Sequence, residues 1–280
     1  MLIFHSIEEC ISWRITKKST VGFVPTMGAL HEGHLSLVDL SQKKCDVTIV
    51  SIFINPTQFA ANEDLDSYPK TIDEDLRLLK EKNVAAVFMP TAEQMYNQKS
   101  DDYFFESELS YKLEGKSRPR FFKGVTTIVH KLFNIVNPTH TVFGQKDAQQ
   151  LLIVEQMIEK KHSSIYLIKG PIVRNNKGLA LSSRNNYLSK KDRLTASNIY
   201  KSLMSLKNKL EGGNENAEDL KRIFTELIRD FPPLSIDYIS IANTKTLEEM
   251  KKVNQSALIS TAVVLNKVRL IDNFIYSPST

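Results

Sequence analysis

The sequence predicts an α/β protein with a parallel-sheet domain over residues 1–172 and a smaller α+β domain over residues 173–280. Short apolar runs alternate with helical patterns through the first part, which favours right-handed βαβ units and a parallel sheet. The pattern changes after Gly170-Pro171, where two long helical stripes precede three strand-like runs. The charge balance changes there too: residues 1–170 carry 20 Lys and Arg against 21 Asp and Glu, and residues 171–280 carry 17 against 11.

The overall composition is that of an ordinary globular protein. Of the 280 residues, 41% are hydrophobic and 25% are charged, which excludes wholesale disorder. No apolar run approaches the ~20 residues of a transmembrane helix, and the N-terminus lacks the basic start and apolar stretch of a secretory signal. Cys10 and Cys45 are too few for a disulfide framework or a Cys-x-x-Cys metal site. We therefore expect a cytoplasmic protein with no membrane partner and no metal site built from protein ligands.

The elements of the first domain follow from their residue patterns. Short β-branched and apolar runs predict strands, and apolar residues at helical spacing among charges predict helices. In chain order we expect a strand at 21–25, a helix from about 35, a strand at 47–55, a helix ending near 83, a strand at 85–89, a helix at 125–136, a strand at 141–143, a helix at 148–160 and a strand at 165–168. This order predicts a Rossmann-like sheet that binds its ligand where the βα loops converge.

The second domain shows a different pattern. Apolar residues recur at helical spacing over 199–210 and again over 220–231, with a Gly-rich loop at 212–214 between them. Strand-like runs follow, and the Asn266-Lys267 pair reads as a hairpin turn. We place these strands at 236–242, 257–265 and 268–272.

Two histidines mark the junction between the first strand and the first long helix. His31 and His34 are three residues apart at a helix N-terminus, where free backbone N–H groups and the helix dipole favour an anion. Gly28 and Gly33 would let the backbone approach such a ligand closely. The alternative is that one histidine caps the helix while the other lies at the surface. A zinc site is disfavoured because no cysteine or further histidine supplies a third ligand at recognisable spacing.

Amide side chains follow the second predicted strand. Asn55 and Gln58 lie in an Asn-Pro-Thr-Gln segment, and amides can bind a hydroxyl and a carboxylate without adding charge. The alternative is an ordinary Asn-Pro turn, which accounts for Asn55 but not for Gln58.

Two further clusters have charges suited to phosphate. Lys146 and Asp147 stand between a predicted strand and helix, where a lysine can bind phosphate and an aspartate can cap the helix or contact a ribose. Ser182, Ser183 and Arg184 form a hydroxyl and guanidinium cluster that fits a polyphosphate clamp, with a plain Ser-rich loop as the alternative. Neither the GxxxxGK[ST] nor the GxGxxG spacing occurs in these clusters, so those two nucleotide-binding folds are not supported.

Together these segments resemble the pantothenate synthetase (pantoate–β-alanine ligase) family. That family lies in the nucleotidyltransferase superfamily marked by an HxGH element and a later KMSKS-like loop. The resemblance runs from about residue 21 to residue 188 and continues more weakly to the C-terminus. It is carried, in this order, by PTMGALHEGH, SIFINPTQF, GKSRP, KLFNIVNP, FGQKDAQQL and GLALSSRNNYL.

The resemblance implies a two-step, ATP-dependent condensation of pantoate with β-alanine through a pantoyl adenylate, releasing AMP and pyrophosphate. By that similarity, His34, His31, Lys146 and Arg184 are the catalytic residues. The ATP site would comprise Met27, Gly28, Ala29, Leu30, His31, Glu32, Gly33, His34, Gly144, Gln145, Lys146, Asp147, Val173, Leu181, Ser182, Ser183 and Arg184. Pantoate would be bound by Gln58, Gln150, Asn55 and Tyr68, with Gln58 also near β-alanine.

The resemblance also implies Mg²⁺ bound through the ATP phosphates and a homodimer formed through the first domain. The sequence departs from the usual family pattern in two motifs. Arg120-Phe121 stands where Gly-His is usual, and Gln145 stands where an acid is usual. We expect these departures to alter the affinity for ATP without abolishing activity.

Two competing interpretations remain. Another adenylyl- or cytidylyltransferase of the same superfamily would share the HxGH element but would leave Gln58 and Gln150 without a role. A nucleic-acid-binding protein would account for the formal net charge of +5. However, the sequence contains no basic stretch interleaved with aromatic residues and no recognised nucleic-acid-binding module, so we expect no nucleic-acid partner.

Overall fold

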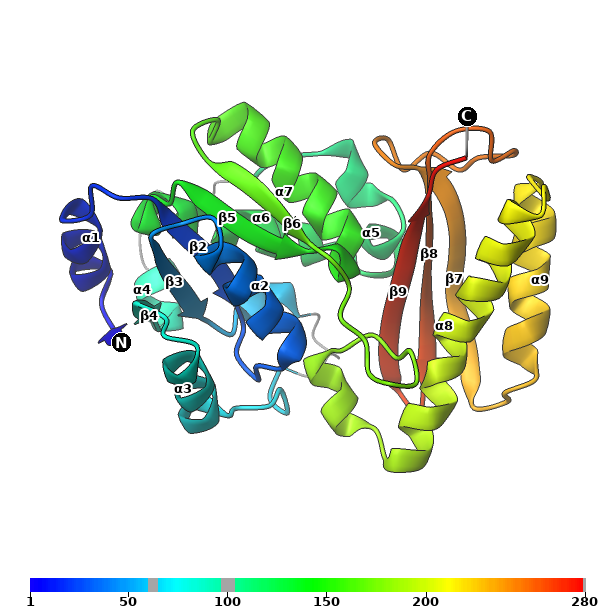
Figure 1. Cartoon of the computed structure of the whole chain (residues 1–280), viewed down its shortest axis with the longest axis horizontal. Helices are drawn as coiled ribbons and strands as arrows, with labels where there is room; N and C mark the ends of the chain where they lie inside the picture. Colours follow the sequence, from blue (N-terminus) through cyan, green and yellow to red (C-terminus); the bar gives the residue numbers. More distant parts are fainter. Residues whose placement is uncertain (60–64, 97–103, 279–280) are drawn as a thin grey trace. The chain divides into compact units, whose positions relative to one another are not determined.

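The computed structural model describes residues 1–59, 65–96 and 104–278, which form two compact units (Figure 1). One unit comprises Met1–Gln145 and Gln149–Pro171, and the other comprises Lys146–Ala148 and Ile172–Thr280. The predicted α/β class, with a parallel sheet followed by a smaller α+β part, is confirmed.

The first unit is built on a parallel six-stranded sheet in the order β1-β4-β3-β2-β5-β6. Its strands are β1 (Leu2–Phe4), β2 (Val21–Thr26), β3 (Val47–Ile52), β4 (Ala86–Phe88), β5 (His140–Gly144) and β6 (Tyr166–Gly170). The chain runs outward from β2 to β3 and β4, and later resumes on the opposite side of β2 with β5. The carboxyl ends of β2 and β5 therefore flank a topological switch point, where sheets of this kind bind ligands.

Helices cover both faces of this sheet. The helices described between residues 1 and 161 are α1 (Ile7–Ile15), α2 (Glu32–Gln42), α3 (Ile72–Glu81), α4 (Ala92–Tyr96), α5 (Glu114–Ser117), α6 (Phe121–Val136) and α7 (Ala148–Lys161). Because neighbouring strand residues point to opposite faces, Val24 packs with Leu35 of α2, whereas Phe23 contacts Phe133 of α6 edge to face at 6.3 Å. Figure 1 shows α2 in front of the sheet and α6 behind it.

Several predicted boundaries differ from those in the structure; helix α8 (Lys190–Glu211), for example, begins at Lys190 rather than near 199, and strand β9 (Val268–Tyr276) ends at Tyr276 rather than at 272. Helix α2 begins at Glu32 rather than near residue 35, because His31 caps it. Strand β3 ends at Ile52 rather than at 55, because Asn55 caps the short 3₁₀ helix Pro56–Gln58. Helix α6 begins four residues before the predicted start, at Phe121. Strand β1 and helices α1, α4 and α5 were not predicted from the sequence.

The second unit packs two helices, α8 (Lys190–Glu211) and α9 (Ala217–Arg229), with an antiparallel sheet. The sheet order is β7 (Leu234–Asn243), β8 (Ala257–Leu265), β9 (Val268–Tyr276). Its core combines Leu203, Phe224 and Ile259. Asn266 and Lys267 both have positive φ, 48° and 70°, as a tight hairpin turn with the sheet's twist requires. The predicted turn is therefore confirmed.

Both cysteines are buried. Cys10 is 0% exposed, and burial raises the pKa of its thiol to about 12. Burial, with a smaller contribution from Asp46, also raises the pKa of Cys45. Since the thiolate is the reactive form, neither side chain is suited to nucleophilic or redox chemistry.

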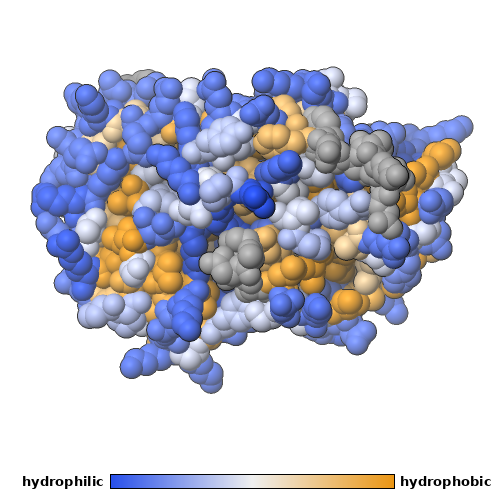
Figure 2. Space-filling view, turned by 180° about the vertical axis from the view of Figure 1, so that it is seen from behind, coloured by the Kyte–Doolittle hydropathy of each residue, from blue (hydrophilic) through white to orange (hydrophobic). Residues whose placement is uncertain are grey.

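The face of the molecule drawn in Figure 2 has no single continuous hydrophobic band. Figure 2 shows hydrophilic side chains over much of one face, with hydrophobic residues in separate patches. Scattered apolar residues are ordinary on protein surfaces. Among the described residues, no helix combines the length and apolar character needed to cross a membrane. Within the same ranges, no three His, Cys, Asp or Glu side chains gather as a metal site would require.

A histidine pair between α6 and the end of α7 should make stability depend on pH. His130 Nδ1 and His162 Nε2 lie 2.8 Å apart, and burial, together with His130, lowers the pKa of His162 to about 4. Between pH 6.5 and 4 the unfolded chain therefore binds a proton at His162 that the folded chain does not, so stability falls with falling pH. Urea unfolding at several pH values should show a shallower loss in His162→Gln than in the wild type. The exposed His5→Gln serves as the control, and equal slopes in all three proteins would contradict the prediction.

Candidate active site

The loop between β2 and α2 has an uncommon backbone conformation. Gly28 and Ala29 both have positive φ, 81° and 51°, and Ala29 is therefore in a region that favours glycine. The loop persists because Asp75 of α3 accepts hydrogen bonds from Ala29 N at 2.9 Å and Leu30 N at 2.8 Å. Thr71 Oγ1 donates to the same carboxylate at 3.1 Å. Asp75 thus holds the turn that leads into His31.

Asp75 was not predicted from the sequence to contact this loop. It is 1% exposed, and burial raises its pKa, while the backbone hydrogen bonds from Leu30 and Ala29 act in the opposite direction. A buried carboxylate with two backbone donors is typical of a residue that shapes a loop. No signal in the sequence links it to a loop about 45 residues earlier.

The two predicted histidines share the N-terminus of α2. His31 is the N-cap residue, and its Nδ1 accepts from Gly33 N at 3.1 Å. His34 Nδ1 accepts from His31 N at 3.4 Å, and the two rings lie 4.1 Å apart between centroids. Because each Nδ1 is an acceptor, a neutral imidazole at either position carries its proton on Nε2. Capping and anion binding are therefore compatible, since the capping atom and the potential phosphate donor are different nitrogens.

The Asn55 and Gln58 cluster is held against α6. Asn55 is 0% exposed, and its Nδ2 donates to Gln58 Oε1 at 2.9 Å and to Gly124 O at 3.1 Å. Its Oδ1 accepts from the hydroxyls of Thr57 and Tyr96. A Cβ at Gly124 would meet Thr57 O at 2.3 Å, so only glycine allows α6 to approach this turn. Asn55 therefore orients Gln58, which is half-buried.

Two neighbouring glutamines on α7 have different environments. Gln149 is 5% exposed, donates to Leu109 O and Lys112 O, and accepts from Glu114 N. It therefore tethers the chain before α6. Gln150, the predicted pantoate ligand, is half-buried instead.

Tyr68 lies in the first unit. The residues that depart from the family pattern, Arg120, Phe121 and Gln145, lie in the same unit. Tyr68 is 6% exposed and contacts Phe59 edge to face at 5.6 Å. Arg120 is the exposed N-cap residue of α6. The Arg118 guanidinium lies 3.8 Å from the centroid of the Phe121 ring. The Phe121 ring therefore packs against the guanidinium of Arg118.

The end of β5 lies at the same sheet edge as the loop between β2 and α2, residues 27–31, which we call the histidine loop. Strands β2 and β5 are parallel neighbours, so Gly144 and Gln145 emerge beside the segment that follows Thr26. The structure thus brings together, within one unit, the predicted ATP residues of 27–34 and 144–145. The chain continues as the 3₁₀ helix Gln145–Asp147, in which Lys146 Nζ lies 3.5 Å from Asp147 Oδ1.

The Ser-Ser-Arg segment is an ordered turn of the second unit. Leu181 N donates to Val173 O at 2.9 Å, which joins these two predicted ATP residues across a short hairpin. Ser182 caps the 3₁₀ helix Ser183–Tyr187, and its hydroxyl accepts from Arg184 N at 3.3 Å. The segment is therefore a capped 3₁₀ turn.

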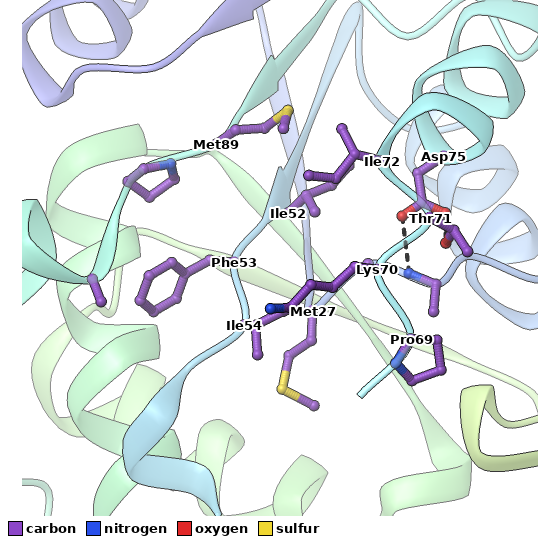
Figure 3. Close-up of a pocket in the computed structure, with 14 residues that line it drawn as sticks. Met27, Ile52, Phe53, Ile54, Pro69, Lys70, Thr71, Ile72, Asp75 and Met89 are labelled. Atoms are coloured by element: carbon purple, nitrogen blue, oxygen red, sulfur yellow. Dashed lines mark hydrogen bonds between the residues drawn. The ribbon is translucent and has the colours of Figure 1, made fainter. Parts of the chain in front are cut away.

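A cavity of about 310 Å³ lies against the histidine loop in the first unit. Figure 3 shows Ile52, Phe53 and Ile54 at the end of β3 on one side, and Asp75 of α3 on the other. Met27, Met89 and Pro69 also line it, so its walls are mostly apolar. Asp75 therefore borders this cavity and also holds the loop backbone at Ala29 and Leu30.

Comparison with known proteins identifies the family. A family model described as pantoate-beta-alanine ligase matches residues 2–275. A relative from Fervidobacterium nodosum named pantothenate synthetase is 47% identical over 261 residues, which cover 93% of each chain. Another of the same name, from Thermosipho africanus, is 46% identical over 278 residues, covering 98% of this chain and 100% of that one.

Solved structures agree with the sequence comparisons. The pantothenate synthetase of Thermus thermophilus superposes with a TM-score of 0.94 at 36% identity, covering 99% of this chain and 100% of that one. The pantoate-beta-alanine ligase of Francisella tularensis, complexed with beta-gamma ATP and beta-alanine, has a TM-score of 0.80 at 34% identity, with 100% of both chains covered. The resemblance seen in the motifs is confirmed. The chain belongs to the pantoate–β-alanine ligase family.

Proposed function

We propose that this chain condenses pantoate with β-alanine in two steps driven by ATP. In the first step the pantoate carboxylate attacks the α-phosphorus, the bond to the β-phosphate breaks and pyrophosphate leaves. In the second, the β-alanine amine attacks the acyl carbon, AMP leaves and the amine loses a proton. The observation that carries this proposal is the His31–His34 pair, which presents two imidazoles at a helix N-terminus beside the switch point.

The chemistry requires positioned donors rather than an enzyme nucleophile, because both nucleophiles are substrates. Charge builds up on the α-phosphate and on the departing pyrophosphate, and preorganised donors stabilise it. His31 and His34 supply Nε2–H donors from the first unit. Lys146 and Arg184 supply cations from the second.

We propose that residues of each unit contribute to ATP binding. In the first, the loop 27–34 and the residues Gly144 and Gln145 line the nucleotide site. In the second, Lys146 and Asp147 act with Val173 and the turn 181–184. Support comes from their place at strand ends and helix N-termini, where anions bind.

Pantoate contacts Gln58 and Gln150 in our proposal, and β-alanine binds near Gln58. Tyr68 borders the same substrate. Asn55 acts through Gln58, because its amide already holds Gln58, Gly124 and Thr57. Neutral amides suit a hydroxy acid whose carboxylate must remain nucleophilic.

The side chains proposed for the phosphates are cationic or neutral donors, so they do not form a metal cage. This composition fits Mg²⁺ held mainly by ATP oxygens and water, where the ion would neutralise triphosphate charge. Among the described residues no three-carboxylate or histidine cluster competes with that arrangement. We further propose that the enzyme works as a homodimer in the cytoplasm.

The fate of ATP tests the proposed function. Pantoate alone should support exchange of labelled pyrophosphate into ATP, and AMP should accumulate only when β-alanine is also present. Formation of ADP would rule out the adenylate route. Exchange without pantoate would point to a different acceptor.

Replacing Gln58 should weaken pantoate binding selectively. In Gln58→Ala the KM for pantoate should rise about tenfold or more, as expected when a hydrogen-bonding partner of a polar substrate is lost. The KM for ATP should change little. Initial rates with each substrate varied in turn measure both constants, and Gln42→Ala at the far end of α2 is the control. A rise confined to the KM for ATP would contradict the assignment.

A further inference from the structure

We infer that Arg174, Asp272 and Asn273 are positioning residues that hold both phosphate-binding loops of the second unit on strand β9. The loops are the turn Lys146–Ala148 and the segment 173–185 that carries Ser182, Ser183 and Arg184. The inference rests on the proposed function, since that proposal assigns these loops to ATP. It adds the group of residues that fixes their geometry.

The segment 173–185 begins as a short hairpin. Arg174 pairs with Ala180 as an isolated antiparallel bridge, and Asn175 N donates to Leu179 O at 3.0 Å. Gly178 closes the turn with a φ of 92°. Ser182 follows this hairpin directly, so the orientation of the hairpin sets the direction of the Ser-Ser-Arg turn.

Arg174 anchors the hairpin to β9 and α8. Its guanidinium makes a bidentate pair with Asp272, with distances of 2.6 Å and 2.8 Å, and donates to Gly178 O at 3.0 Å. It also stacks on the Tyr200 ring at 4.0 Å. A Cβ at Gly178 would meet Tyr200 at 2.3 Å, so the hairpin backbone lies directly against the same ring. Only the planar fork of arginine satisfies the carboxylate, the carbonyl and the ring together.

Strand β9 holds the other loop through the next residue. Asn273 Nδ2 donates to Lys146 O at 2.9 Å, and Asn273 N donates to Asp272 Oδ1 at 2.7 Å. Neighbouring strand residues point to opposite faces. Asp272 therefore holds the hairpin on one face of β9, and Asn273 holds the Lys146 turn on the other. Two adjacent residues thus fix the separation between the two sets of phosphate donors.

The side chains of Arg174, Asp272 and Asn273 have little conformational freedom because they are largely buried. The side chains of Arg174 and Asp272 are 17% and 5% exposed, and Asn273 is 3% exposed. A second ion pair on β9 offers a comparison: Arg269 Nη2 lies 2.6 Å from Asp237 Oδ2, and its guanidinium lies over Tyr238. It has the same chemical groups, but it joins β9 to β7 rather than to the hairpin 174–180. It is therefore a matched control.

The test separates loop positioning from stability with two parallel sets of variants. Arg174→Gln, Asp272→Asn and the double variant are compared with Arg269→Gln, Asp237→Asn and their double variant. Each single change at the buried pair leaves a charge without its partner, so the melting temperature should fall. The double variant removes both charges and should recover part of that loss. It should nevertheless bind ATP about tenfold or more weakly, because the loops are no longer held in place.

Calorimetric titration with ATP gives the binding constant without relying on pantoate chemistry. We expect weaker ATP binding in the Arg174–Asp272 set and in Asn273→Leu, with the KM for pantoate within about twofold of wild type. We expect no change in ATP binding in the Arg269–Asp237 set. ATP affinity equal to that of the wild type in the Arg174–Asp272 double variant would overturn the inference, as would equal losses in both sets. If the wild type binds ATP but does not turn over pantoate, the proposed function fails while this comparison still decides the inference.

Discussion

The His34→Ala variant should exchange pyrophosphate into ATP roughly 10²-fold or more slowly than the wild type. Removing one preorganised donor from a developing phosphate charge typically has this effect. His34 is suited to that role because its Nδ1 accepts from His31 N, which leaves Nε2 as the protonated nitrogen. The measurement is the steady-state rate of isotope exchange with pantoate and ATP both saturating.

Two further variants divide the roles of the two ring nitrogens. An asparagine at position 34 can imitate the capping Nδ1, and a glutamine can imitate the donor at Nε2. If donation to phosphate is the main role, His34→Gln should retain more exchange activity than His34→Asn, despite losing the cap. A cap is worth about 1 kcal/mol, which urea unfolding can measure separately. The opposite order of exchange rates would assign His34 a structural role.

Lys146→Ala should give a similar loss of exchange, because it removes a cation proposed to bind the phosphates.

The Asp75→Ala variant should lose both stability and adenylation. The change leaves the buried N–H of Ala29 and the partly buried N–H of Leu30 without this acceptor, and the buried group alone costs about 1–3 kcal/mol. The loop would then relax from its positive φ values and move His31, which follows directly. Urea unfolding and pyrophosphate exchange measure the two effects.

A neighbouring residue provides the control for Asp75. Asp73 lies in the same first turn of α3, carries the same charge and is exposed. Asp73→Ala therefore changes the helix-end electrostatics without touching the loop. If Asp75→Ala and Asp73→Ala were equally stable and equally active, Asp75 would have no part in shaping the site. Asp75→Asn should resemble Asp75→Ala, because an amide offers a donor where one of the two N–H groups needs an acceptor.

Local patterns were sufficient to predict the fold class. Apolar runs such as 47–52 and 86–88 are buried strands, and their separation by helices is enough to predict a parallel sheet. Element boundaries were less predictable because caps decide them, as at His31 and Asn55. Strand β1 was missed because three residues are too few to show a period.

Part of the candidate site could be proposed from the sequence, because its residues form local clusters. His31, His34, Gln58, Lys146 and the Ser-Ser-Arg turn stand out because polar residues cluster at strand ends. Asp75 could not be found in this way, since its partners lie 45 and 46 residues away. Arg174 and Asp272 are 98 residues apart, and each alone reads as an ordinary charged residue. Residues that position a loop from a distance have no local pattern.

The burial of the two thiols has a practical consequence for labelling. Maleimide dyes react with thiolates, and Cys10, fully buried with a pKa of about 12, remains protonated at neutral pH. Cys45 is only 8% exposed, and its pKa is also raised. A single cysteine introduced at an exposed position such as Lys251 would therefore take up the dye selectively. Such a variant can thus be labelled at one position with both of the protein's own cysteines left in place.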